Sequence, residues 1–252
     1  QFIPASAIIS ISDVPKADKP ANIIVSRLRS FEAAAQYIGK RPAVLNFASA
    51  TNPGGGVEKG ASAQEECLCR VSTLYPCLAD QKMRASFYTP HRKNGNTLHN
   101  DDIIYTPKVL IIKDDDHNML ATPFLVDVIS CAAPNLREKS NNAYNSGDGN
   151  KVQISDNELL ALHEKRARKI FASAIANGVE VLILGAFGCG AFQNDPHIVA
   201  QAYKNVLPAF AHYFHTIEFA IYCRPADSIN YDAFSWEILT KHCINAEKVV
   251  PL

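Results

Sequence analysis

The sequence has no excess charge of either sign, because 25 Lys and Arg residues balance 25 Asp and Glu residues. Proteins that bind nucleic acid usually carry a basic domain or stripe, and none stands out here. Long hydrophobic runs are missing too, since no apolar stretch approaches the ~20 residues that a membrane-spanning helix needs. We therefore expect neither nucleic acid nor a membrane among the partners of this chain.

We also expect no signal peptide at the start of this sequence. The chain begins Gln-Phe-Ile-Pro, with neither an initiator Met nor the charged region that opens such a peptide. We expect that it starts inside a longer gene product or after processing.

Cysteine forms no recognisable framework. The seven cysteines are an odd number and lie scattered along the chain, which favours reduced thiols and a cytoplasmic location. Cys67 and Cys69 have no second Cys or His pair at a matching distance. We therefore expect no metal site.

The chain alternates between apolar runs and amphipathic segments. Its 252 residues, 47% of them hydrophobic and 20% charged, can bury a sizeable core. Short apolar runs predict buried strands and 3.6-residue periodicity predicts helices. Such alternation predicts an α/β fold with helices on both faces of a sheet. We expect strands at 23–25, 43–47, 109–113, 124–131, 179–184 and 217–223, and helices at 31–38, 64–75, 156–177, 196–212 and 231–243.

Two stretches read as irregular. Residues 76–102 are polar, and their isolated His91 and His99 are interpreted as solvated loop residues. Residues 134–151 are rich in Asn, Ser and Gly, which is typical of a long surface loop. The basic cluster at 163–169 is interpreted as the solvated face of its helix.

The most informative stretch runs from Asn52 to Arg70. It reads Asn-Pro-Gly-Gly-Gly, seven further residues, then Gln-Glu-Glu at the start of a predicted helix. Glycines 54–56 allow positive φ and a close approach of backbone amides to a ligand. The carboxylates suit the positive end of the helix dipole. A glycine loop for phosphate followed by two carboxylates predicts a site for a phosphorylated sugar, although capping glutamates and turn glycines are each common alone.

A second glycine loop, Gly185-Ala-Phe-Gly-Cys-Gly190, follows the predicted strand at 179–184. At the carboxyl end of a strand it should carry exposed amides suited to a diphosphate. A single turn of this kind is weak evidence, because it can be only a tight turn. Two such loops in one α/β chain can close on one diphosphate from opposite sides.

The spacing of Gly-Gly-Gly and Gln-Glu-Glu resembles the signature of microbial-type poly(ADP-ribose) glycohydrolases, which are built on a macrodomain. The resemblance covers residues from about 23 to 234. It rests on the blocks 43–70, Ile-Tyr-Thr-Pro at 104–107, Ser-Cys-Ala-Ala-Pro-Asn at 130–135 and Leu-Gly-Ala-Phe-Gly-Cys-Gly-Ala-Phe-Gln-Asn-Asp at 184–195.

The resemblance implies a macrodomain-like three-layer α/β/α sandwich with a central mixed sheet. We expect residues 1–22 to form an extended lead-in and residues 23–252 to form one catalytic domain. The implied reaction is hydrolysis of ribose–ribose O-glycosidic bonds, with ADP-ribose polymer or ADP-ribosylated protein as partner, ADP-ribose as product and no cofactor.

Site residues follow from the same resemblance. Glu66 is expected to be the general acid/base, which requires a desolvated carboxyl. Glu65 points about 100° away from Glu66 around a helix, so it should not act on the same oxygen without a bend; the resemblance implies that it orients ribose hydroxyls. Phe192 should contact the distal ribose, a core aromatic being the alternative. Arg29 stands where macrodomains usually have an adenine-binding Asp. The expected substrate-binding residues are Asn52, Gly54, Gly55, Gly56, Gln64, Gly185, Gly188, Cys189, Gly190, Ala191 and Phe192.

Two other functions stay open at this point. A non-catalytic ADP-ribose reader would have no need of paired carboxylates. A hydrolase of mono-ADP-ribosylated protein or other conjugates would keep the same site.

Overall fold

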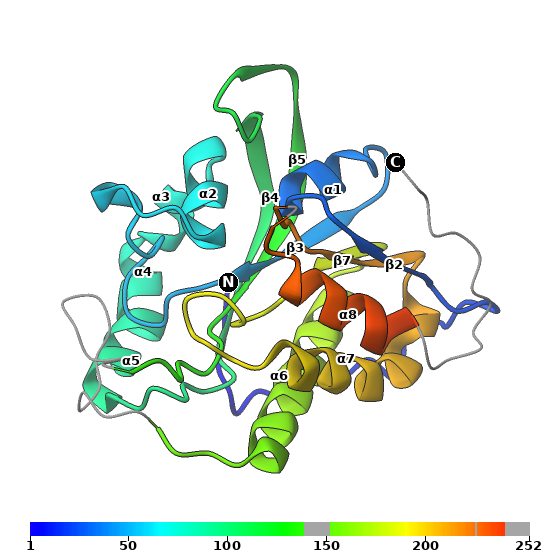
Figure 1. The fold of residues 1–252 in the computed structure, drawn as a ribbon. Helices are drawn as coiled ribbons and strands as arrows, with labels where there is room; N and C mark the ends of the chain where they lie inside the picture. The colour runs from blue at the N-terminus through cyan, green and yellow to red at the C-terminus, as the bar shows by residue number, and fades with distance from the viewer. Residues whose placement is uncertain (139–151, 225, 240–252) are drawn as a thin grey trace.

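The computed structural model describes residues 1–138, 152–224 and 226–239 (Figure 1). Within them a seven-stranded sheet has the order β1-β4-β5-β3-β6-β7-β2. The strands β2, β7, β6, β3 and β5 run parallel, whereas β4 is antiparallel to β5 and β1 is antiparallel to β4. The bounds are β1 Phe2–Ile3, β2 Asn22–Ser26, β3 Pro42–Phe47, β4 Ile103–Lys113, β5 Met119–Cys131, β6 Val181–Leu184 and β7 Thr216–Ala220.

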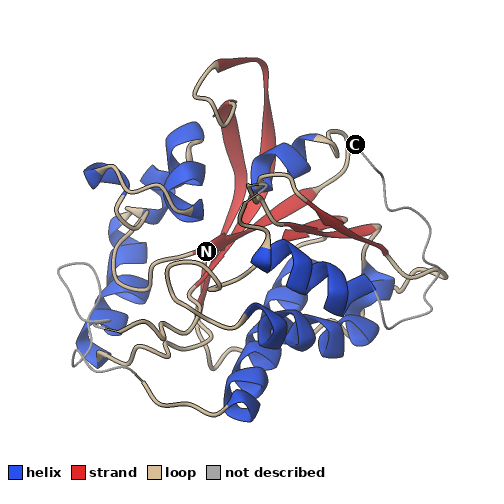
Figure 2. Cartoon of the chain, viewed as in Figure 1, coloured by secondary structure: helices blue, strands red, loops and turns tan. Residues whose placement is uncertain are grey.

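Helices cover both faces of the sheet (Figure 2). Successive strand residues point to opposite faces, so Leu45 packs against the α6–α8 side and Val44 against the α1–α3 side. The bounds are α1 Ser30–Ala35, α2 Gln64–Val71, α3 Leu74–Leu78, α4 Gln81–Met83, α5 Thr89–Asn94, α6 Asp156–Ala176, α7 Pro196–Phe210 and α8 Ile229–Leu239. The described residues thus form the three layers that the sequence predicts.

The first residues are tied to the sheet. Strand β1 pairs with β4 through Phe2 and Ile104, and the amino group of Gln1 donates to the carbonyl of Tyr105 at 2.7 Å. The division into a lead-in and one domain stays a prediction, but the start of the lead-in is an edge strand.

The prediction that residues 76–102 are irregular is wrong for most of this stretch. It contains α3 to α5 and a π-helical turn, Arg84–Tyr88. Pro90 lies in the first turn of α5, where a missing amide costs nothing. His91 is buried rather than solvated: its Nδ1 contacts the carbonyl of Phe87 at 2.8 Å and its Nε2 contacts Asn100 Oδ1 at 2.9 Å.

The basic cluster at 163–169 is only partly solvated, which also corrects the sequence interpretation. Arg166 is fully buried, and its Nε donates to Asp101 Oδ1 at 3.2 Å. His163 is buried against Asn194, with 2.9 Å between Nε2 and Oδ1. Burial lowers the pKa of His163 to about 4, so its ring is neutral. These polar groups pack inward because each has a buried partner.

Two expectations reach beyond the described residues. Most of the predicted loop at 134–151 and the end of the predicted helix at 231–243 lie outside them; the described part of that helix is α8.

Candidate active site

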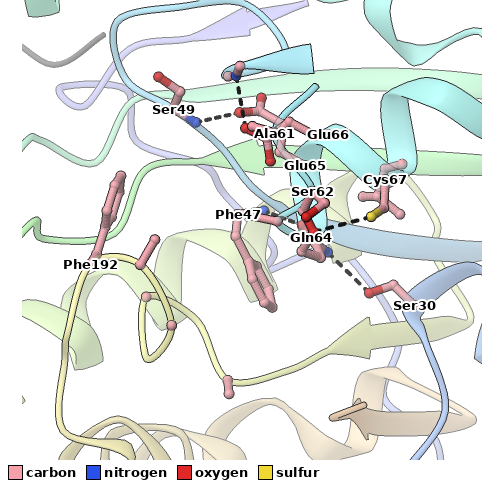
Figure 3. Close-up of a pocket in the computed structure, with 18 of the residues that line it drawn as sticks. Ser30, Phe47, Ser49, Ala61, Ser62, Gln64, Glu65, Glu66, Cys67 and Phe192 are labelled. Atoms are coloured by element: carbon pink, nitrogen blue, oxygen red, sulfur yellow. Dashed lines mark hydrogen bonds between the residues drawn. The ribbon is translucent and has the colours of Figure 1, made fainter. Parts of the chain in front are cut away.

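A cavity of about 790 Å³ opens at the carboxyl ends of the parallel strands (Figure 3). Phe47 at the end of β3, Ala186 after β6 and Ala220 at the end of β7 all line it. This edge is where open α/β sheets bind ligands, because loops diverge there. The residues from the start of α2 and from both glycine loops lie around the same cavity.

Gln64 fixes the start of α2 against the sheet. Its Oε1 accepts from the amide of Phe47 at 2.9 Å, and its Nε2 donates to the carbonyl of Leu45 at 2.8 Å and to Ser30 Oγ at 3.1 Å. Gln64 therefore joins α2, β3 and α1. It lines the cavity, but its hydrogen bonds go to the protein.

Glu65 is buried and accepts hydrogen bonds from three residues, one of which is the amide of Gly54. Its Oε1 accepts from Asn46 Nδ2 at 3.2 Å and its Oε2 accepts from the amide of Ser49 at 2.8 Å. Burial raises the pKa of Glu65 to about 8, and the neighbouring charge of Glu66 adds to the rise. At neutral pH Glu65 is therefore mostly protonated.

Glu66 lies beside it (Figure 3) and keeps one oxygen without a partner. Its Oε1 accepts from the amide of Gly56 at 2.8 Å. Its Oε2 has no hydrogen-bond partner among the described residues. The residue is only 8% exposed. A carboxyl group in this state is desolvated, fixed in direction, and able to exchange a proton with a ligand oxygen.

The two carboxylates converge more than helix geometry predicts. A Cβ on Gly55 would lie 2.3 Å from Glu66 Oε1 and 3.1 Å from Glu65 Oε2. The side chains leave the helix in different directions, but their oxygens reach the same point under the glycine turn. The prediction that the two carboxyls act on different ligand oxygens stays a prediction.

The glycines at 54–56 hold carboxylates instead of offering their amides to a ligand. Gly56 donates to Glu66, Gly54 donates to Glu65, and the amide of Gly55 donates to the carbonyl of Asn52 at 3.0 Å. Gly54 and Gly55 have φ of 66° and 59°, values that L side chains rarely adopt. This loop therefore supports the acid pair, whereas the sequence interpretation gave it a phosphate.

The second glycine loop, at 185–190, and the two residues after it contain backbone amides without a hydrogen-bond partner in the described chain. Within the described chain, the amides of Gly188, Gly190, Ala191 and Phe192 donate no hydrogen bond. Gly188 adopts φ of 81°, and all four residues line the cavity. Consecutive unpaired amides at a turn form an anion site. The expected place of a diphosphate at this loop stays a prediction.

Three expected binding residues do not line the cavity: Gly54, Gly185 and Cys189. Gly54 is required for packing, since a Cβ there would lie 2.7 Å from the ring of Tyr75. Gly185 has the same constraint, with the carbonyl oxygen of Ala220 at 2.8 Å from such a Cβ.

Sequence reasoning missed several residues around the cavity. Asn46 and Ser49 hold Glu65, and Tyr222 lines the far wall. The guanidinium of Arg29 lies 4.2 Å over the Tyr222 ring and 4.0 Å from Asp115. Asn46 is the single polar residue in the apolar run of β3, and this was the signal that the sequence offered.

The order of the sheet and the position of the cavity define a macrodomain-like α/β/α protein. Its paired buried carboxyls beside this cavity are the groups that glycosidases use.

Comparisons with known proteins agree with this class. The family described as microbial-type PARG, catalytic domain, matches residues 9–114. The poly(ADP-ribose) glycohydrolase of Thermomonospora curvata is 34% identical with a TM-score of 0.77, over 89% of this chain and 79% of that one. The enzyme of Deinococcus radiodurans, solved with ADP-ribose, is 33% identical with a TM-score of 0.77, over 90% and 88%. No curated protein sequence matches. This chain belongs to the microbial-type poly(ADP-ribose) glycohydrolase family, and the predicted fold class is confirmed.

Proposed function

We propose that this chain hydrolyses ribose–ribose O-glycosidic bonds in poly(ADP-ribose) and releases ADP-ribose, with Glu66 as general acid/base. The observation that carries the proposal is the state of Glu66 at the cavity, with one carboxylate oxygen fixed by the Gly56 amide and the other without a partner in the described chain. The relatives support the ligand class, since one is solved with ADP-ribose and another with the inhibitor ADP-HPD.

Glu66 would act first as an acid. Departure of the leaving sugar generates an oxocarbenium-like centre, so a proton must reach the bridging oxygen as the bond breaks. The carboxylate that remains can then take a proton from the attacking water. Glu65, whose oxygens lie beside those of Glu66 under Gly55, would orient the ribose hydroxyls next to the acid.

The diphosphate would lie on the second glycine loop. The unpaired amides of Gly188, Gly190 and Ala191 point to this assignment, since backbone amides bind phosphate without a compensating positive side chain. Phe192 is half-buried at the same loop and would bound the distal ribose. A cavity of about 790 Å³ is within the usual range for a ligand of nucleotide size.

The substrate is tested by presenting polymer and a mono-ADP-ribosylated protein separately and measuring the ADP-ribose released. We expect release from polymer. Release only from the mono-ADP-ribosylated protein would favour the second hydrolase, and binding without any release would favour a reader.

The role of Glu66 is tested by Glu66→Gln, which keeps the shape but removes the titrating proton. We expect hydrolysis to fall by at least about 10³-fold while calorimetric affinity for ADP-ribose changes little. Retained turnover would remove Glu66 from the mechanism.

We also propose a cytoplasmic location. The six cysteines in the described part of the chain are free, which is typical of a reducing compartment. No described helix is long and apolar enough to cross a bilayer.

A further inference from the structure

The helical segment from Leu74 to Asn94 contacts the glycine turn and the residues just before it. None of its residues lines the cavity, so the proposed reaction gives it no role. Two of its side chains nevertheless reach the turn. The ring of Tyr75 lies against Gly54, and the Tyr75 hydroxyl donates to the carboxylate of Glu58 in the short 3-10 turn that follows the glycines.

Arg92 makes the second link, across 40 residues of sequence. From α5, its Nε donates to the carbonyl of Thr51 and its Nη2 donates to Asn52 Oδ1 at 3.2 Å. Thr51 is buried and Asn52 lines the cavity. One guanidinium therefore holds a backbone carbonyl and a side-chain carbonyl of two consecutive residues. A planar fork of donors suits two acceptors at once, which a lysine ammonium cannot match in geometry.

The Thr51–Asn52 corner is connected to Glu66 by two hydrogen bonds of the glycine turn. The carbonyl of Asn52 accepts from the amide of Gly55 at 3.0 Å, which closes the glycine turn. The next amide, that of Gly56, donates to Glu66 Oε1 at 2.8 Å. A displacement of the Thr51–Asn52 corner would therefore move the donor that fixes Glu66.

We propose that Arg92 is a positioning residue that holds the Asn52 corner and, through the glycine turn, the direction of the Glu66 carboxyl. The inference rests on the proposed function of Glu66. Arg92 acts on the reaction without lining the cavity, so its removal affects turnover more than ligand affinity. Catalytic geometry is sensitive to such shifts, and a displacement of about 1 Å can cost up to about 10²-fold in rate.

The test compares Arg92→Ala with Lys93→Ala. Lys93 is exposed on the same helix turn, and its loss removes the same charge without a described bond to the corner. With poly(ADP-ribose) as substrate, we expect kcat of Arg92→Ala to fall about tenfold and KM to change less than about threefold. Lys93→Ala should match the unaltered chain. Equal kinetics for the two variants would overturn the proposal.

Two further variants separate positioning from general destabilisation. Arg92→Lys keeps the charge and can reach one acceptor, so we expect kcat between those of Arg92→Ala and the unaltered chain. In an Asn52→Ala background the cost of Arg92→Ala should shrink to about threefold, because coupled neighbours are non-additive. Full additivity would contradict the proposal, even if Arg92→Ala also lowered the melting temperature.

Failure of the proposed function would give a different result from failure of the Arg92 proposal. In that case the unaltered chain would release no ADP-ribose from polymer. Failure of the Arg92 proposal instead leaves a fully active chain and a fully active Arg92→Ala variant.

Discussion

The two glycine loops of this chain look alike in sequence but differ in what their amides do. In the loop at 54–56 every amide is used inside the protein, two of them by Glu65 and Glu66. In the loop at 185–190 the amides of Gly188 and Gly190 are unpaired within the described chain. The first loop therefore holds Glu65 and Glu66, and the second has unpaired amides at the cavity, where we propose that an anion binds. Glycine-rich sequence alone does not distinguish these roles.

The sharpest test of this difference is Gly55→Ala. The added Cβ would lie 2.3 Å from Glu66 Oε1 on backbone with φ of 59°, so the carboxylate must move. We expect kcat to fall by about 10²- to 10³-fold, measured as release of ADP-ribose from polymer.

Its matched control is Gly95→Ala. Gly95 also has positive φ, 65°, but nothing lies within 4 Å of a Cβ there. This variant should lose stability only. Equal losses of turnover in both variants would show that backbone strain, not contact with Glu66, is responsible.

The next effect concerns pH. Since burial raises the pKa of Glu65 to about 8 from its ordinary 4.5, the folded chain holds a proton that the unfolded chain releases. This contribution to stability is full below pH 4.5 and is lost as pH rises through about 8. We expect the free energy of unfolding to fall by up to a few kcal/mol over that window. Denaturant titrations at several pH values should show the slope in the unaltered chain and its absence in Glu65→Gln; an identical slope in both would contradict the assignment.

Gly188→Ala tests the second loop. Its Cβ would lie 2.6 Å from Ala133 Cβ and 2.7 Å from Asn194 Nδ2, on backbone with φ of 81°. We expect a loss of about 1–3 kcal/mol in stability and weaker calorimetric binding of ADP-ribose. Unchanged affinity would argue against an anion site at this loop.

The smallest effect belongs to Gly190→Ala. No atom lies within 4 Å of a Cβ at this position, so stability should change by less than about 0.5 kcal/mol. Gly190 lines the cavity, and a methyl group there should lower ADP-ribose affinity a few-fold. A large loss of melting temperature would show that the loop is packed differently.

Much of the fold could be predicted from the sequence, since its central strands and long helices carry strong apolar patterns. The run at 43–47 and the periodic helix at 156–177 match β3 and α6 closely. The helices between Leu74 and Asn94 were missed, because they are only three to six residues long and α5 is mostly polar. Their burial depends on partners distant in sequence, such as Asn100 for His91 and Thr51 for Arg92.

The sequence by itself determined the layers, the family, and the presence of two carboxyls after a glycine loop. Those features follow from local periodicity and spacing, which are written along the chain. Only the tertiary structure decided that the glycine amides hold Glu65 and Glu66 and that the two carboxyls converge beneath Gly55. It alone also placed Arg92 in hydrogen-bond contact with Asn52. Hydrogen bonds and desolvation depend on which residues distant in sequence come into contact. Spacing along the chain does not specify those contacts.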